Sequence, residues 1–284
     1  MGFKKLVKKI ARFVLTESSD KFTKVEVAQI NYGGCLSGKK IVITGGGKGI
    51  GYHIAKRVMA EGAECVITGR NKDVLSRSAS ELGAKCHPII FDVTNVHSCR
   101  QFLDQARESL GGELDFLVCN ARISLHEGHF SKVTVEGFDS QFNTNLKGTY
   151  FLSKAFLEMK LEEEHPCGEL LLITSETADQ CYDIPYGLTK ASLNSLTGAL
   201  SRRVYQSGIR VNAIAPGVTV TDMTKDYASA KDGNMTSLHS ASGRLFLPEE
   251  IAEVALFLLS DASKCISGEI IHCNAGNHLK VYWE

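Results

Sequence analysis

Seven short apolar runs, each separated from the next by a helix-like segment, constrain the fold more than any other feature of the chain. They fall at residues 40–44, 64–68, 87–91, 114–119, 168–174, 209–215 and 269–273. Because the runs are apolar throughout, we expect strands buried on both faces, as in a parallel sheet covered by helices. Right-handed crossovers then predict one doubly wound α/β domain with a mostly parallel sheet of seven strands. Its ligand site should lie at the carboxyl ends of the strands.

The chain divides near residue 38 into an N-terminal segment and one large domain. Residues 17–38 include Gly33-Gly34 and follow neither a helical nor a strand pattern, so we expect a connector there. The regular alternation of strand and helix begins at Lys39. We therefore predict a helix and connector over residues 1–38 and the α/β domain over residues 39–284.

Residues 3–14 carry the pattern of a basic amphipathic helix. Phe3, Leu6, Val7, Ile10, Phe13 and Val14 share one face, and Lys4, Lys5, Lys8, Lys9 and Arg12 fill the other. Two interpretations stay open: peripheral contact with an anionic membrane surface, or packing on the body of the protein or on a second subunit. The second is favoured, because a helix this short binds a membrane weakly without lipidation.

Charge balance and scattered cysteines exclude several classes of protein. The chain holds 32 Lys plus Arg and 32 Asp plus Glu, so no overall positive field attracts nucleic acid. No apolar run reaches the ~20 residues that span a bilayer. The nine cysteines never form a C-x-x-C pair, which argues against a zinc site and a disulfide framework. A reducing cytoplasm fits this pattern best.

A glycine-rich loop follows the first predicted strand directly. Residues 44–51 have the sequence TGGGKGIG, and helical spacing begins within this stretch. Glycines allow a tight turn and let the backbone approach a pyrophosphate, which the positive N-terminus of a helix also attracts. The loop therefore predicts that a dinucleotide binds at this end of a Rossmann domain, with a merely flexible turn as the weaker alternative.

Further motifs occur in a fixed order along the chain. They are Asp92-Val93, Asn120-Ala121, Asn145 in an N-x-N-L-K-G stretch, Ser175 at a strand end, Tyr186-Gly-Leu-Thr-Lys190 as Y-x-x-x-K, and Pro216-Gly217 with Thr221. Together with the glycine-rich loop, the set resembles the short-chain dehydrogenase/reductase family over roughly residues 39–279. Within the family it looks most like the 3-oxoacyl-[acyl-carrier-protein] reductases.

The resemblance implies an oxidoreductase that passes hydride between NAD(P) and a small carbonyl compound or secondary alcohol. It implies a homodimer or homotetramer. The catalytic residues that it implies are Asn145, Ser175, Tyr186 and Lys190. The cofactor-binding residues are Gly45, Gly47, Lys48, Gly49, Ile50, Gly51, Arg70, Asp92, Val93, Asn120, Ala121, Tyr186, Lys190, Pro216, Gly217, Thr219 and Thr221.

The Y-x-x-x-K pair has a physical basis of its own. Tyr186 and Lys190 lie four residues apart, so they share one face of a helix and their side chains can converge. A free phenol titrates near pH ~10, and a neighbouring ammonium lowers that value by favouring the phenolate. Tyr186 is therefore predicted to act as general acid in reduction and as general base in oxidation.

Ser175 and Asn145 are the remaining members of the predicted catalytic set. Ser175 would donate a hydrogen bond to the substrate oxygen, where negative charge develops, although a serine at a strand end can also simply cap a turn. By resemblance, Asn145 holds a water that passes protons to Lys190, although it could be a satisfied core amide. Ser175 precedes Tyr186 by eleven residues, fewer than usual in the family, which predicts a short loop over the substrate.

Charge at the end of the second strand predicts the choice of cofactor. An acidic residue there holds the ribose 2′-hydroxyl of NAD and repels the 2′-phosphate of NADP. In this chain the strand ends with Gly69-Arg70, Lys48 lies in the glycine-rich loop, and Asp73 falls in the next helix. NADP(H) is therefore the preferred cofactor, with NAD(H) as the alternative; two solvated surface cations would be the other explanation.

Two segments depart from the family pattern or vary within it. Arg122 stands where the family has the glycine of N-N-A-G, so we expect strain or an outward side chain if that position needs a positive φ. This departure motivates a rival hypothesis, a catalytically silent NAD(P)-binding regulator.

Residues 222–246 are small and polar and are predicted to form a mobile lid that selects the substrate.

Overall fold

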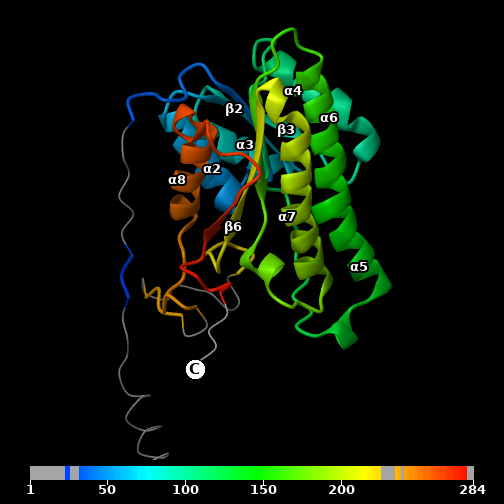
Figure 1. Ribbon diagram of the computed structural model, residues 1–284. Coiled ribbons are helices and arrows are strands. Elements are labelled where there is room, and N and C mark those ends of the chain that lie inside the picture. Colours follow the sequence, from blue (N-terminus) through cyan, green and yellow to red (C-terminus); the bar gives the residue numbers. More distant parts are fainter. Residues whose placement is uncertain (1–22, 26–31, 225–233, 238–239, 280–284) are drawn as a thin grey trace, which may run out of the picture.

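The computed structural model of the protein describes residues 23–25, 32–224, 234–237 and 240–279, in which strands and helices alternate along the chain (Figure 1). The strands of this part are β1 (Lys40–Thr44), β2 (Glu64–Gly69), β3 (Cys86–Ile90), β4 (Phe116–Cys119), β5 (Gly168–Ile173), β6 (Ile209–Pro216) and β7 (Ile270–Cys273). The helices are α2 (Gly49–Ala60), α3 (Lys72–Leu82), α4 (Cys99–Ser109), α5 (Val135–Gln141), α6 (Thr149–Leu161), α7 (Pro185–Val204) and α8 (Pro248–Leu259).

The described strands form one seven-stranded sheet in the order β3-β2-β1-β4-β5-β6-β7, and every pairing is parallel. This confirms the predicted doubly wound Rossmann architecture. The chain first builds outward from β1 to β3 and then returns to add β4 on the other side. Strand order therefore reverses between β1 and β4, and a crevice opens there at the carboxyl ends of the strands.

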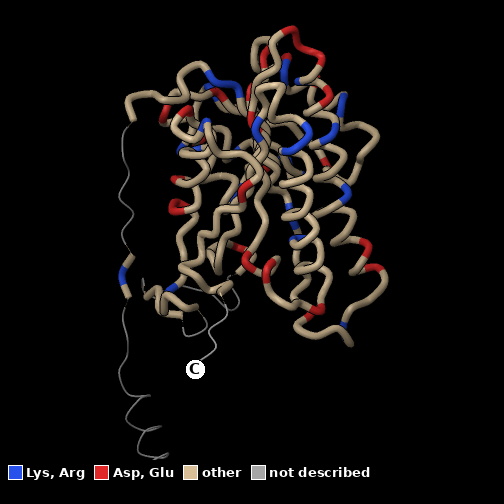
Figure 2. The backbone as a smooth tube through the Cα atoms, in the orientation of Figure 1, with Lys and Arg blue, Asp and Glu red and all other residues tan. Residues whose placement is uncertain are grey.

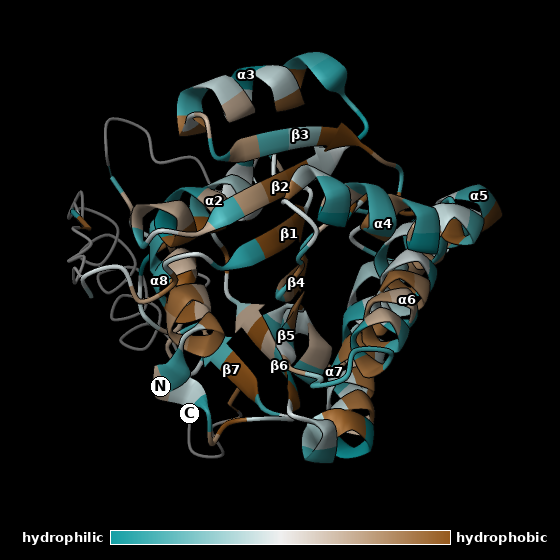
Figure 3. Ribbon diagram, turned by 90° about the horizontal axis from the view of Figure 1, so that it is seen from above, coloured by the Kyte–Doolittle hydropathy of each residue, from teal (hydrophilic) through white to brown (hydrophobic). Residues whose placement is uncertain are grey.

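Helices cover both faces of the sheet, as the continuously apolar strands require (Figure 3). On one face, Ile41 and Ile43 of β1 pack in a core with α2, α3 and α8. Val42, the residue between them, points to the other face and packs in a second core with α4 and α6. Because alternate residues of a strand face opposite sides, a buried strand must be apolar at every position.

Two expectations concern residues that the structure describes only in part or not at all. The amphipathic helix predicted over residues 3–14 lies outside the described residues, and so does part of the predicted lid over residues 222–246. Residues 234–237 of that lid are described, and they lie beside the N-terminal segment. The Met235 N–H donates to the Thr23 carbonyl over 2.9 Å, and Val25 packs against the apolar cluster of Met235 and Leu245.

Charged residues and cysteines are spread over the described part of the chain rather than clustered. Basic and acidic residues are both scattered over the backbone (Figure 2). All nine cysteines are free, and five of them are buried or half-buried in the body of the domain. None of the helices in the described residues is both long and apolar enough to cross a membrane.

Candidate active site

The glycine-rich loop forms a tight turn between β1 and α2. Gly45 and Gly49 adopt positive φ values of 63° and 55°, which favour glycine. A Cβ on Gly51 would lie 2.5 Å from the Gly45 carbonyl oxygen, so the helix can begin this close to the turn only with glycine. Thr44 fixes the turn to the segment that follows β4, because its Oγ1 accepts the Asn120 N–H over 2.9 Å and the Ala121 N–H over 3.0 Å.

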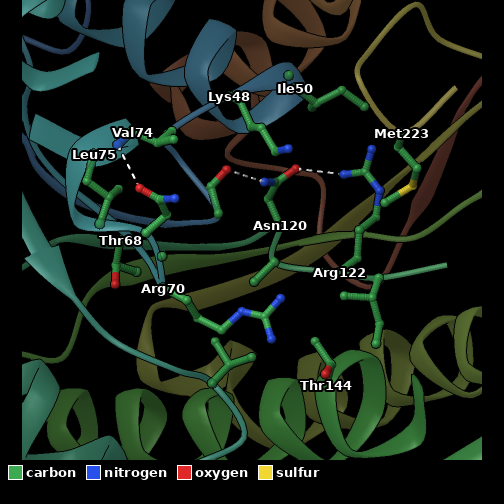
Figure 4. A pocket seen from close by; sticks show the side chains of 18 of the residues that line it. Lys48, Ile50, Thr68, Arg70, Val74, Leu75, Asn120, Arg122, Thr144 and Met223 are labelled. Atoms are coloured by element: carbon green, nitrogen blue, oxygen red, sulfur yellow. Dashed lines mark hydrogen bonds between the residues drawn. The ribbon is translucent and has the colours of Figure 1, made fainter. Parts of the chain in front are cut away.

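A cavity of about 340 Å³ lies beside this turn, at the carboxyl ends of β1 to β4 (Figure 4). Most of the residues predicted to bind the cofactor line it: Gly45, Gly47, Lys48, Gly49, Ile50, Arg70, Asp92, Val93, Asn120, Ala121 and Thr221. Gly51 lies behind the turn instead, where it permits close packing. Lys48 and Arg70 extend into the cavity from different segments, and Lys48 lies 3.3 Å from the Asp222 carboxylate.

Asn120 supports the loop rather than simply lining the cavity. Its side-chain amide donates to the Thr44 carbonyl over 2.9 Å and to the Gly45 carbonyl over 3.1 Å. These bonds give hydrogen-bond partners to two carbonyl groups at the tight turn. Asn120 thus stabilises the conformation of the glycine-rich loop.

Tyr186 and Lys190 lie on the first turns of α7, which begins with Pro185 in its first turn. The Lys190 ammonium is 5.7 Å from the centroid of the Tyr186 ring and donates to the Ile173 carbonyl over 2.7 Å. Lys190 is only 1% exposed. Burial, assisted by the positive charge of Arg122, holds the pKa of Lys190 well below its usual value.

A second and larger cavity, about 740 Å³, adjoins the first. Ser175, Tyr186, Pro216, Gly217 and Thr219 all line it. Ser175 follows β5 and caps a short turn, η4 (Glu176–Asp179), by accepting the Thr177 N–H at its Oγ over 3.3 Å. This cap uses an oxygen lone pair, so the Ser175 hydroxyl proton is still available to a substrate.

Asn145 and Lys190 do not line either cavity but lie behind the cavity walls. Asn145 sits in a π-helical segment, η3 (Phe142–Gly148), between α5 and α6. Its amide pairs with the backbone of Ile123: the oxygen accepts the N–H and the nitrogen donates to the carbonyl, both over 2.9 Å. It also donates to the Thr189 hydroxyl over 3.3 Å, which links η3 to the helix that carries Tyr186.

Arg122 behaves differently from both outcomes expected for it. Positive φ values among the described non-glycine residues occur only at His126 and Ala275, so the Arg122 backbone carries no left-handed strain. Its side chain does not point outward either, because it lines both cavities. The guanidinium donates to the side-chain oxygen Oδ1 of Asn120 over 3.1 Å (Figure 4). Because Arg122 lines both cavities, its charge lies where they meet.

Sequence reasoning missed several residues that line the second cavity. Glu176 and Asn277 are the most notable, because the Asn277 amide donates to the Glu176 carboxylate over 3.0 Å across that wall. The only available signal was the position of Glu176 directly after Ser175. Nothing in the pattern of the sequence indicates that Asn277, which is 101 residues away, would meet it.

Comparisons with known proteins agree with this geometry. Residues 45–278 match the family model described as enoyl-(acyl carrier protein) reductase. The chain is 32% identical to the 3-oxoacyl-[acyl-carrier-protein] reductase FabG of Escherichia coli (strain K12), over 86% of this chain and 99% of that protein. It is 30% identical to the L-rhamnose 1-dehydrogenase (NADP(+)) of Thermoplasma acidophilum, over 85% of this chain and 96% of that protein.

A solved structure extends the likeness from sequence to fold. It is a short chain dehydrogenase from Burkholderia cenocepacia J2315 in complex with NADP, with a TM-score of 0.75 and 27% identity. The match covers 85% of this chain and 98% of that one. The chain therefore belongs to the short-chain dehydrogenase/reductase family and is an oxidoreductase that acts on CH–OH or carbonyl groups with NAD(P).

Proposed function

We propose that this protein is an NADP(H)-dependent oxidoreductase in which Tyr186 exchanges the proton that accompanies hydride transfer to or from a small carbonyl compound or secondary alcohol. The observation that carries the proposal is the meeting of two cavities. The glycine-rich cradle lines one, Ser175 and Tyr186 line the other, and Ile50, Arg122, Thr221 and Met223 line both. A dinucleotide in the first cavity would present its reactive end to a substrate in the second.

The residues present fit a dinucleotide. A Cβ on Gly45 would lie 3.0 Å from the Asn120 side chain, so the loop is packed as closely as a pyrophosphate cradle requires. Gly49 and Ile50 begin α2 and line the cavity, which places the positive end of that helix beside the space for the phosphates. When bound, the cofactor supplies or accepts the hydride.

Proton exchange at the substrate oxygen is assigned to the chain itself. In reduction, Tyr186 gives its phenolic proton to the oxygen of the carbonyl that receives hydride, and in oxidation its phenolate takes the proton from the alcohol. Ser175 donates a hydrogen bond to the same oxygen and stabilises the charge that develops there. Lys190 stabilises the phenolate through its positive charge, and Asn145 is assigned the positioning of the proton path behind it.

Preference for NADP(H) rests on the two cations that enter the first cavity. Arg70 follows β2, where an NAD-specific protein would carry a carboxylate, and Lys48 lies opposite in the glycine-rich loop. A 2′-phosphate would receive charge-assisted hydrogen bonds from both side chains. The similar Burkholderia structure is a complex with NADP, and the Thermoplasma relative is an NADP(+) enzyme, which supports the same choice.

A deuterium-transfer experiment tests the proposed reaction. The protein is mixed with NADPH labelled at the nicotinamide C4 and with 3-oxoacyl thioesters, keto sugars and quinones in turn. We expect oxidation of NADPH with at least one of these classes, and deuterium on the new carbinol carbon of the product. Tight binding of NADPH without turnover of any class would instead support the rival hypothesis of a regulatory protein.

We further propose that the protein is a homo-oligomer. Large apolar side chains are exposed on α6, where Tyr150 is 45% exposed and Leu161 is 46% exposed. Such side chains are commonly covered when they form part of a subunit interface.

A further inference from the structure

Glu176 is a buried carboxyl group in the wall of the substrate cavity that the proposed chemistry does not use. It follows Ser175 directly, begins η4, lines the second cavity and is only 6% exposed. Burial raises the pKa of this carboxyl group, and hydrogen bonds from Asn277 and Asn274 oppose the rise. A buried carboxyl group is costly unless its oxygens are well satisfied, so its presence here needs an explanation.

The contacts of Glu176 leave hydrogen-bonding capacity for a ligand. One oxygen, Oε2, accepts the Asn277 amide over 3.0 Å. Among the described residues, no Lys, Arg or His lies within ion-pair distance of either oxygen. The Asn274 amide is a second donor to the carboxyl group. A carboxylate has about four acceptor sites, so two amide donors satisfy only part of them.

The turn that carries Glu176 is held rigidly. Asp179, at the other end of η4, accepts a hydrogen bond from His272 of β7 over 2.8 Å and from Asn194 of α7 over 3.3 Å. Asn277 is fixed in turn, because its side-chain oxygen accepts the Ala241 N–H over 3.0 Å. The carboxyl group is therefore positioned in advance beside Ser175, as selective recognition of a substrate requires.

Polar side chains continue the wall on both sides of Glu176. Thr177, Gln180 and Asn277 line the same cavity. A long acyl chain would have to cover these polar groups without hydrogen-bonding to them, which costs free energy. A substrate with several hydroxyl groups would satisfy them.

We propose that Glu176 accepts a hydrogen bond from a hydroxyl group of the substrate, and that the substrate is a polyhydroxylated compound such as a sugar or sugar acid. This inference rests on the proposed function, because it assigns a substrate class to the same cavity. The hydroxyl that Glu176 binds lies in the same cavity as the reacting carbon, since Ser175 and Glu176 both line that cavity. Glu176 is then a specificity residue rather than a participant in proton exchange.

The test compares L-rhamnose, D-gluconate and acetoacetyl-coenzyme A as probes. Reduction of NADP+ by the two polyols and oxidation of NADPH by the thioester are measured with the full chain. We expect turnover of a polyol, with a kcat/KM at least 10-fold above that of the thioester. In Glu176→Leu, kcat/KM for that polyol should fall by about 10- to 100-fold, mainly through KM, because a hydrogen bond to a charged group is lost. Glu176→Gln keeps an acceptor oxygen, so its kcat/KM for the polyol should lie between those of the wild type and of Glu176→Leu.

Monodeoxy derivatives of the accepted polyol separate recognition from a merely structural role. With the wild-type protein, removal of one particular hydroxyl should lower kcat/KM by the same factor as Glu176→Leu does with the complete polyol. With Glu176→Leu, removal of that same hydroxyl should lower kcat/KM no further. Equal losses for every derivative in both proteins would overturn the proposal. Turnover of the thioester alone, unchanged in Glu176→Leu, would overturn it while leaving the proposed function intact. Absence of turnover with all probes while NADPH still binds would overturn both.

Discussion

The ammonium of Lys190 lies 5.7 Å from the ring centroid of Tyr186, one helical turn earlier on α7. Among the described residues, no carboxylate forms an ion pair with Lys190, whose ammonium donates to the Ile173 carbonyl. When Lys190 is protonated, no carboxylate therefore neutralises its charge, and the charge can act on the phenol. Arg122 adds a second positive charge to the same site and opposes protonation of Lys190.

Replacement of Arg122 by glycine, the family residue, is expected to raise the pKa of Lys190. Burial and the charge of Arg122 both lower this pKa at present, so removal of the second cause should move it part of the way back toward 10.5. The measurement is a pH titration of the 13C-labelled lysine side chains by NMR in the cofactor-free protein, with Lys190→Met to assign the signal. An unchanged titration would show that Arg122 does not act on Lys190.

Arg70→Asp is expected to change the cofactor preference. A carboxylate at this position would repel the 2′-phosphate and could accept the ribose hydroxyl of NAD, so the ratio of the Kd values for NADH and NADPH should fall about 10- to 100-fold. Fluorescence titration measures both constants. Arg77→Asp is the matched control, because it makes the same charge change on α3 without lining the cavity. Equal changes of the Kd ratio in the two variants would indicate a general electrostatic effect rather than a direct contact between Arg70 and the 2′-phosphate.

Acid stability should depend on Glu61, which joins α2 to the N-terminal connector. Burial alone would raise the pKa of the Glu61 carboxyl group. Hydrogen bonds from Arg57 and from the N–H groups of Gly34, Tyr32 and Cys35 outweigh burial and lower that pKa to about 2. Because this pKa is lower in the folded than in the unfolded chain, Glu61 stabilises the fold above pH 4.5, and this contribution is lost as the pH falls toward 2.

Urea unfolding at several pH values tests this dependence. Glu61→Gln should lower the free energy of unfolding at pH ~7 and flatten its decline at acid pH. Glu108→Gln, at an exposed position on α4, is the control and should change neither. A wild-type pH dependence in Glu61→Gln would contradict the prediction.

The exposed apolar surface of α6 predicts a subunit interface there. Phe151 is 38% exposed, and Phe151→Glu should shift the protein toward monomers because it places a charge where a partner helix would pack. Light scattering during size-exclusion chromatography measures the mass. Ile90→Glu, at an exposed position on the edge strand β3, should keep the wild-type mass. A monomeric wild-type protein would remove the proposal.

The fold was largely predictable from the sequence because its signal is local. Each predicted strand is found, and most bounds agree within one residue. The fourth strand was predicted from residue 114 but begins at Phe116. The Leu114 carbonyl accepts the Lys160 ammonium, whereas the Asp115 N–H still donates to the Lys40 carbonyl of β1.

The substrate wall was not predictable, because it depends on contacts between distant segments. Glu176 and Asn277 meet only after β7 has joined the sheet and placed its following turn beside η4. The orientation of Arg122 was not predictable either, although the sequence shows that an arginine replaces the family glycine at this position. That direction is set by a hydrogen bond to Asn120, whose own amide is committed to the glycine-rich loop.

The rate of hydride transfer in Tyr186→Phe tests the central claim most directly. A single turnover with saturating NADPH and an accepted carbonyl compound should slow by about 100- to 10,000-fold, the usual contribution of a general acid. The Kd of NADPH should stay within about twofold, because the phenol ring and its packing remain. Tyr205→Phe, at an exposed position outside both cavities, is the control and should react at the wild-type rate. A Tyr186→Phe variant that transfers hydride nearly as fast as the wild type would contradict the account.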